Sequence, residues 1–194
     1  RCLDLGCGDG NIVLKIAQEK DLGKVFGSDI SSLAADQASR NAKDLNIDSD
    51  FRCGDGFKPW EGQTFDIISC DVAAISRIIA DKSDWYDGVD CDTGDDGLRL
   101  VTPLVEQAKH HLADDGIFVI PTISLANENQ LLACLEMNFG HVQMDKKKEW
   151  PMPDEIVRSL NDAQIPIVCD NWNITEKFGL FIAHTAVYVC SDAK

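Results

Sequence analysis

The stretch Leu3-Asp4-Leu5-Gly6-Cys7-Gly8-Asp9-Gly10-Asn11 decides the fold of this chain. It has the pattern of the end of a buried strand, a glycine turn and the first turn of a helix that runs to about residue 20. Gly6, Gly8 and Gly10 tolerate positive φ, and they let a ligand approach the backbone with no Cβ in the way. The helix start that follows presents unpaired N–H groups to such a ligand. The stretch therefore predicts a strand–turn–helix ligand site.

The spacing of the glycines narrows the kind of ligand. The dinucleotide fingerprint Gly-x-Gly-x-x-Gly would need a glycine at position 11, where the chain has Asn11. An NAD-dependent oxidoreductase is therefore the least favoured enzyme class. A purely structural interpretation stays open, because any tight strand-to-helix turn can recruit glycine.

The length of the chain predicts a single domain over residues 1–194, since 194 residues is an ordinary size for one α/β domain. The chain opens on Arg1-Cys2, inside what should already be the first strand, so we expect that an N-terminal portion is missing. No apolar run approaches the length of a membrane span, and no signal peptide is visible.

The net charge and the cysteine content limit the cellular location and the binding partners that the sequence predicts. The formal net charge of −15 disfavours broad binding of nucleic acid, although Lys146-Lys147-Lys148 forms a local basic run. The eight cysteines contain no Cys-x-x-Cys pair, which favours a reducing, cytoplasmic location over a disulfide framework or zinc site. The acidic loop at 81–96 lacks the spacing of a calcium loop, so we expect no metal.

Strand-like and helix-like segments alternate along the chain, which predicts a doubly wound α/β fold with a mostly parallel sheet. Further strands are expected at 24–30, 49–53, 64–70, 116–123, 141–147 and 180–190, and helices at 11–20, 31–46, 98–112 and 128–138. Residues 151–178 interrupt this pattern. They are expected to form a substrate-side cap with Trp150 and Trp172 as apolar contacts, or else a surface excursion.

Acidic residues follow four of the predicted strands, at the sheet edge where open parallel sheets bind ligands. These residues are Asp4, Asp29, Asp55 (with Gly56) and Asp71. A carboxylate at Asp29 can accept both hydroxyls of a ribose, and Asp55 can accept from an exocyclic amino group. Ile30 can present an apolar face to an adenine. A negative edge suits a cofactor that carries a sulfonium and an ammonium better than one with a pyrophosphate.

Four motifs in this order make the chain similar to the class I S-adenosylmethionine-dependent methyltransferases. They are Asp4 to Gly10, Gly27-Ser28-Asp29-Ile30, Gly54-Asp55-Gly56 and Phe65 to Asp71. The resemblance implies S-adenosyl-L-methionine as cofactor and a seven-stranded sheet whose last strand is antiparallel. The expected cofactor-binding residues are Asp4, Gly6, Cys7, Gly8, Gly10, Asp29, Ile30, Asp55, Gly56 and Asp71.

The fourth motif resembles the "methyltransferase small domain" group, which includes release-factor glutamine and ribosomal-RNA base N-methyltransferases. In that group the strand ends in Asn- or Asp-Pro-Pro-Tyr, which grips a planar nitrogen. Here Asp71 is followed by Val72-Ala73-Ala74, so the stacking aromatic residue is absent. Trp85 or Tyr86 could replace it from the following loop, although packing is the commoner role of such a residue.

The resemblance implies an enzyme that N-methylates a protein or a nucleic-acid-associated acceptor. Asp71 is the expected catalytic residue, because its carboxylate could hold the acceptor or help to remove its proton. Two alternatives stay open, a small-molecule methyltransferase and a catalytically silent cofactor-binding subunit. The altered fourth motif keeps the second of these in play.

Overall fold

The computed structural model describes residues 1–20, 22–86 and 92–194, so Cys91 and part of the expected acidic loop lie outside the described residues. The strands are β1 (Cys2–Leu5), β2 (Val25–Asp29), β3 (Ser49–Cys53), β4 (Phe65–Cys70), β5 (Leu112–Ile123), β6 (Phe139–Pro151), β7 (Thr175–Lys177) and β8 (Leu180–Ala193). The α-helices are α1 (Asn11–Lys20), α2 (Ser32–Asp44), α3 (Arg77–Ala80), α4 (Val101–Ala108), α5 (Glu128–Asn138) and α6 (Asp154–Asp162). Short 3₁₀ helices occur at Lys58–Trp60 and Asp84–Tyr86.

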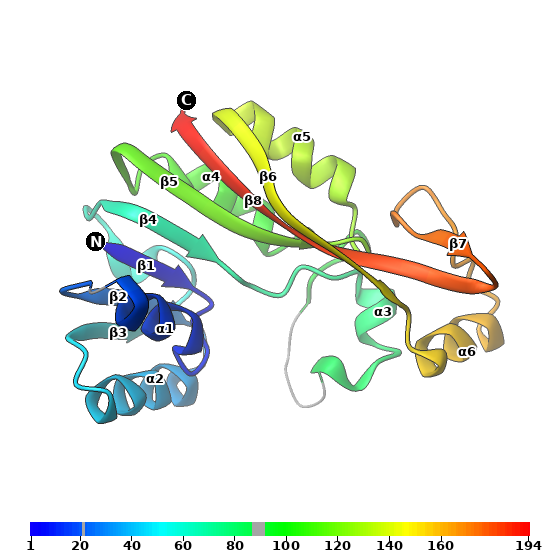
Figure 1. The fold of residues 1–194 in the computed structure, drawn as a ribbon, viewed down its shortest axis with the longest axis horizontal. Coiled ribbons are helices and arrows are strands. Elements are labelled where there is room, and N and C mark those ends of the chain that lie inside the picture. Colours follow the sequence, from blue (N-terminus) through cyan, green and yellow to red (C-terminus); the bar gives the residue numbers. More distant parts are fainter. Residues whose placement is uncertain (21, 87–91) are drawn as a thin grey trace.

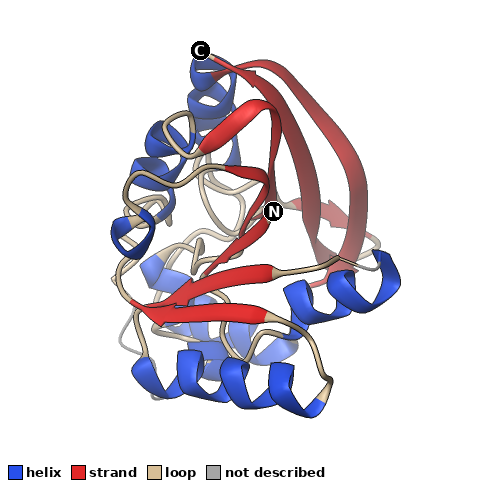
Figure 2. Cartoon of the chain, turned by 90° about the vertical axis from the view of Figure 1, so that its left-hand side faces the viewer, coloured by secondary structure: helices blue, strands red, loops and turns tan. Residues whose placement is uncertain are grey.

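These strands form one twisted sheet in the order β3-β2-β1-β4-β5-β8-β6 (Figures 1 and 2). The pairs among β1 to β5 are parallel, whereas β8 runs antiparallel to both β5 and β6. The predicted doubly wound, mostly parallel sheet with an antiparallel last strand is confirmed. The short β7 adds an eighth strand, because it folds back on the start of β8 as a hairpin.

Three elements, β5, α4 and β6, differ most in their bounds from those expected. Strand β5 begins at Leu112 rather than residue 116, and α4 is correspondingly shorter than the predicted helix over 98–112. The reason is a β-bulge: Phe65 of β4 pairs with Leu112, and the regular ladder resumes at Ile67 with Ile117. Asp114 and Asp115 therefore lie within the strand. Strand β6 is also longer than expected, because it pairs along most of β8.

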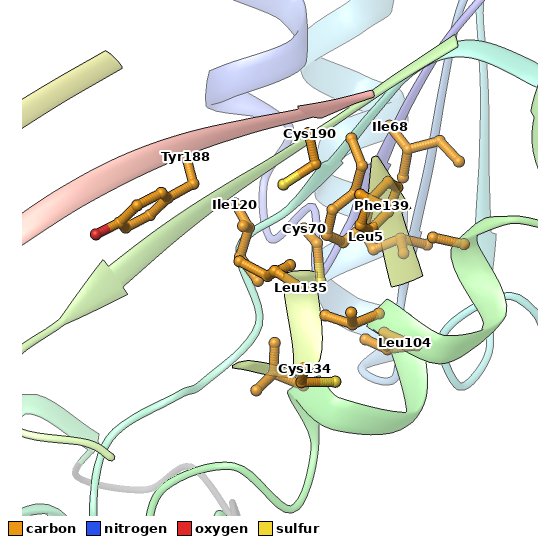
Figure 3. Close-up of a cluster of buried hydrophobic side chains, with 14 of the residues drawn as sticks. Leu5, Ile68, Cys70, Leu104, Ile120, Cys134, Leu135, Phe139, Tyr188 and Cys190 are labelled. Atoms are coloured by element: carbon orange, nitrogen blue, oxygen red, sulfur yellow. The ribbon is translucent and has the colours of Figure 1, made fainter. Parts of the chain in front are cut away.

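The core has a part on each face of the sheet. On one face, α1 and α2 pack against β1 and β2 through residues such as Val13 and Ala42. On the other face, α4 and α5 supply Leu104 and Leu135, which meet Leu5, Ile68 and other strand residues (Figure 3). This division follows from the alternation of side chains along a strand. It leaves the carboxyl ends of β1, β2 and β4 together at one edge.

A separate apolar cluster lies beyond that edge, around the end of β6 and the start of β8. Its buried members include Ile79 of α3, Ile156 of α6, Trp172 and Ala183. The segment 151–178, expected as a cap or an excursion, therefore packs against α3 and β8 through a core of its own. Figure 1 shows α3, α6 and β7 gathered at this end of the molecule.

None of the helices in the described ranges is both long enough and apolar enough to cross a bilayer.

Candidate cofactor and acceptor site

The glycine turn after β1 brings its backbone against the end of β4. Gly6, Gly8 and Gly10 have φ values of +73°, +53° and +83°, which L side chains rarely adopt. A Cβ on Gly6 would lie 3.0 Å from the carbonyl oxygen of Asp71 and 3.0 Å from Cγ1 of Val72. The turn thus needs glycine at this position both for its conformation and for its close approach to Asp71.

Asp29, at the end of β2, fastens this turn. One carboxylate oxygen accepts the Gly8 N–H at 2.9 Å, and the other accepts the Ser31 N–H at 2.9 Å. Each carboxylate oxygen has a further lone pair, so the group can still accept hydroxyls from a ligand. The neighbouring Ile30 has 76% of its surface exposed, which leaves an apolar face beside the carboxylate.

Asp4 lies beneath the turn and is almost fully buried, with 1% of its surface exposed. The Ser69 hydroxyl donates to its Oδ1 at 2.6 Å. Burial raises the pKa of Asp4 to about 6; the charges of Asp71 and Asp29 add to this rise, and the Ser69 hydrogen bond opposes it. Three of the predicted carboxylates are therefore close enough to influence one another.

Asp71 continues from β4, and its backbone N–H donates to the Leu5 carbonyl at 3.1 Å. Its side chain is exposed to solvent, although the crowded backbone around it removes enough water to raise its pKa. A carboxylate with a raised pKa, reachable from solvent and next to the glycine turn, is suited to accept a proton or an N–H hydrogen bond.

Asp55 and Gly56 are arranged differently from one another. The Asp55 carboxylate forms an ion pair with Lys58 at 2.7 Å, and 63% of its side chain is exposed. The Gly56 carbonyl instead points inward and accepts the Ser28 hydroxyl at 2.9 Å. Asp55 thus has a partner of its own at the surface, while Gly56 is tied to β2 beside Asp29.

Three further residues complete the site. One of them was predicted from the sequence and two were not. Cys7 is buried and its N–H donates to the Ser28 carbonyl at 3.0 Å, so this predicted residue holds the turn through its backbone. Ser28 and Ser69 were not predicted. Both are buried hydroxyls within apolar strands, and that polar interruption is the sequence signal that could have identified them.

The residues that follow Asp71 are apolar and form a wall beside it. Val72 and Ala74 are half-buried and pack against the main core. Trp85, one of the two aromatic residues considered as a replacement for the missing tyrosine, packs edge-on against Trp150 with ring centroids 6.0 Å apart. Its indole is thus engaged in packing.

One hollow lies elsewhere, in the open groove between α1 and α2. It has a volume of about 780 Å³ and is bordered by residues such as Ile12, Lys15 and Leu45. Its lining includes none of Asp4, Asp29, Asp55 and Asp71. In the ranges described, no three His, Cys, Asp or Glu side chains gather as a metal site.

The arrangement fits S-adenosylmethionine. At Gly6 the space for a Cβ is taken by Asp71 and Val72, whereas at Gly8 a Cβ would meet no atom within 4 Å, so the backbone there is open to a ligand. The carboxylates of Asp4, Asp29 and Asp71 give this edge a negative potential that complements a sulfonium and an ammonium group. A dinucleotide pyrophosphate would meet repulsion at the same place.

Comparison with known proteins agrees with this geometry. The family described as methyltransferase domain matches residues 1–164. The chain is 31% identical over 124 residues to a release factor glutamine methyltransferase of Koribacter versatilis, covering 61% of this chain and 44% of that protein. It is 28% identical over 149 residues to a ribosomal protein uL3 glutamine methyltransferase of Xanthomonas campestris, covering 74% and 48%. The chain therefore spans less than half the length of these two relatives.

Solved structures share the fold. The YcgJ protein from Bacillus subtilis superposes with a TM-score of 0.62 at 17% identity, covering 99% of this chain and 92% of that one. The Thermus thermophilus 16S rRNA N2 G1207 methyltransferase, solved with AdoMet and guanosine, gives 0.59 at 16% identity over 98% of this chain and 37% of that one. With the family match to residues 1–164, the chain belongs to the class I methyltransferases that use S-adenosylmethionine.

Proposed function

We propose that this chain transfers a methyl group from S-adenosylmethionine to a planar nitrogen of a protein or nucleic-acid-associated acceptor. The observation that carries the proposal is the packing of the Gly6 turn against Asp71, with Asp29 fastening the same turn through Gly8. The names of the relatives, which include glutamine and ribosomal-RNA methyltransferases, support an acceptor of this kind.

The roles proposed for the cofactor-side residues follow from their contacts. Asp29 would accept ribose hydroxyls with the lone pairs left free by Gly8 and Ser31. Ile30 would cover one face of the adenine, and the exposed Asp55 would accept from its amino group. Bound there, S-adenosylmethionine supplies a methyl group on a positively charged sulfur. Asp4 would favour that charge from beneath the turn.

Asp71 is proposed to act on the acceptor. Its carboxylate would accept an N–H of the acceptor, orient the nitrogen lone pair and raise its nucleophilicity. The half-buried Val72 and Ala74 would exclude water on that side, and alignment of the nitrogen would contribute most of the rate enhancement. The segment 151–178 would border the acceptor as a substrate-side cap, built on its contacts with α3.

The net charge and the cysteines indicate which acceptors and which cellular location suit this reaction. The net charge of −15 opposes broad affinity for RNA, so any nucleic-acid acceptor would need local contacts. The seven free cysteines of the described ranges are compatible with the cytoplasmic, reducing location that we propose.

Cofactor binding and turnover together test this function. S-adenosylhomocysteine should bind at micromolar affinity in calorimetry and raise the melting temperature, whereas NAD should do neither. Incubation with methyl-labelled S-adenosylmethionine should then label a protein or RNA fraction. Label only in small molecules would favour the small-molecule alternative, and binding without any label would favour the silent subunit.

Asp4 gives a prediction about pH. Its folded-state pKa of about 6 lies above the unfolded value, so its stabilising protonated form is fully present below about pH 4. That contribution is lost as the pH rises through 6. Asp4→Asn, which keeps an acceptor for Ser69, should therefore raise the free energy of unfolding at pH 7.5 by about 1–2 kcal/mol.

The same substitution should weaken binding of S-adenosylmethionine at pH 7.5, because it removes a buried negative charge near the cation. In the wild type, affinity should fall between pH 7.5 and pH 5, and it should fall less in the Asn variant. Urea denaturation and calorimetry at both pH values measure the two effects. An Asn variant that is less stable at pH 7.5, with an unchanged pH profile, would contradict this account of Asp4.

A further inference from the structure

A buried polar cluster lies at the end of the sheet away from the glycine turn. Glu128, the first residue of α5, has 4% of its surface exposed, and His184 of β8 has 7%. Oε1 of Glu128 accepts from the Thr122 hydroxyl at 2.8 Å. Its Oε2 is 2.9 Å from the Asn173 amide nitrogen and 2.8 Å from Nε2 of His184. None of these residues belongs to the proposed cofactor site, and Asn173 lies in the segment 151–178 that is proposed to border the acceptor.

The contacts of Glu128 fix which nitrogen of His184 carries a proton. Burial alone would raise the pKa of Glu128, but the hydrogen bonds from Asn173 and Thr122 and the nearby His184 outweigh it and lower that pKa. An ionised carboxylate can only accept, so Nε2 of His184 is the protonated nitrogen. In the neutral ring, Nδ1 is then a bare hydrogen-bond acceptor.

Nδ1 of His184 has no protein partner in the described ranges. The fully buried polar side-chain atoms without a hydrogen-bond partner in those ranges are Trp60 Nε1 and Thr93 Oγ1. Nδ1 of His184 is not among them, so protein atoms do not enclose it completely. His184 borders a pocket of about 380 Å³ between β6, β8 and the segment before β7. His184 lines this pocket, which is therefore the open space that its Nδ1 can reach.

The other residues that line the pocket indicate which kind of ligand it could bind. Trp172, Ile174 and Ile182 give it apolar sides. At the rim, Glu149 is paired with Lys177 at 2.7 Å, and Lys147 lies nearby. Two cations at the rim and two carboxylates, Glu128 and Glu149, leave the surroundings with no net charge, which favours a neutral ligand.

This pocket is distinct from the proposed acceptor position. His184 pairs with the residue that follows β5, two strands away from β4 and about three residues further along than Asp71. Strand spacing and rise then place the two residues roughly 14 Å apart. In Figure 1 the glycine turn and the start of β8 accordingly lie in different parts of the molecule.

We propose that this pocket is a second ligand site, which binds a compact, neutral, largely apolar group that donates one N–H or O–H hydrogen bond to Nδ1 of His184. Amides and hydroxyls attached to an aromatic ring have this chemistry. The pocket would bind such a group whether or not the chain transfers methyl groups, because none of its residues belongs to the cofactor site.

Benzamide is a suitable probe, with acetophenone as the matched compound that replaces the NH₂ group with a methyl group. The titration uses the full chain at pH 8, with saturating S-adenosylhomocysteine so that the cofactor site is filled. The His184 side-chain ¹⁵N signals report binding by NMR. Benzamide should shift the Nδ1 signal saturably with a Kd of about 1 mM, and acetophenone should bind about tenfold more weakly.

One variant at the rim and one control outside the pocket test the location without disturbing the core. Val168 borders the pocket with 58% of its surface exposed, so Val168→Trp should obstruct entry and weaken benzamide binding at least tenfold. Met137 on α5 is 70% exposed and borders no part of the pocket, so Met137→Trp should leave binding unchanged. An unshifted Nδ1 signal, equal affinity for both compounds, or normal binding by Val168→Trp would each overturn the proposal. Failure of S-adenosylhomocysteine to bind would count against the methyltransferase function alone.

Discussion

Replacing Asp71 with asparagine should lower the rate of methyl transfer on the order of 10²-fold while leaving cofactor affinity little changed. Asparagine keeps an oxygen that can accept an N–H at the same place. It loses the negative charge and the basicity, and the basicity is the property that desolvation increases by raising the pKa of Asp71. The loss should therefore appear in the chemical step, and a single-turnover assay on the identified acceptor measures it.

The control for Asp71→Asn is Asp81→Asn, which changes an exposed aspartate at the end of α3 and should leave the rate unchanged. If Asp71 served only to form the turn after β4, asparagine would replace it well, because asparagine is itself a good turn residue. A single-turnover rate equal to wild type would therefore end the catalytic assignment. Calorimetry with S-adenosylhomocysteine in the same variant excludes an indirect effect through the cofactor.

Asp29→Ala should weaken binding of S-adenosylmethionine by about 1.5–3 kcal/mol, which corresponds to about 10- to 150-fold in affinity. Two losses contribute. The ribose hydroxyls would lose a charged acceptor, and the N–H groups of Gly8 and Ser31 would lose the carboxylate that holds them at 2.9 Å. Calorimetric titration of the variant gives the affinity directly.

Matched variants separate these two contributions. Asp29→Asn keeps one acceptor for a backbone N–H, so it should bind more tightly than the Ala variant and less tightly than wild type. Asp36→Ala, at an exposed position on α2, removes the same charge at the surface and should have little effect. Unchanged affinity in Asp29→Ala would remove Asp29 from the cofactor site.

Local signals in the sequence were sufficient for most of the sheet. The alternation of apolar strands with helices predicts β3 and α5 with their observed bounds. The structure adds the cap of α2, where the Ser31 side chain accepts from the N–H of Ala34. What local pattern could not supply was long-range pairing. The bulge that extends β5 back to Leu112 depends on its contact with Phe65, and β7 exists because it can pair with β8.

The candidate site shows the same division. The glycine turn and the acidic strand ends could be predicted, because each depends on residues adjacent in sequence. Ser69 was harder to identify: the sequence shows only a hydroxyl in an apolar strand, and its role depends on a carboxylate 65 positions away, Asp4. Glu128 and His184 were likewise invisible, since their side chains meet only when β8 lies beside β5.

The position of β8 constrains the order in which this chain can assemble during synthesis. Strand β8 lies between β5 and β6, although β6 precedes it in the sequence. As the chain leaves the ribosome, β1 to β5 can form their parallel ladders with α1, α2 and α4. Strand β6 must then wait, unpaired, until residues 180–193 have emerged to bridge it to β5. During that interval the edges of β5 and β6 are open to wrong partners, so their pairing with β8 competes with misassembly.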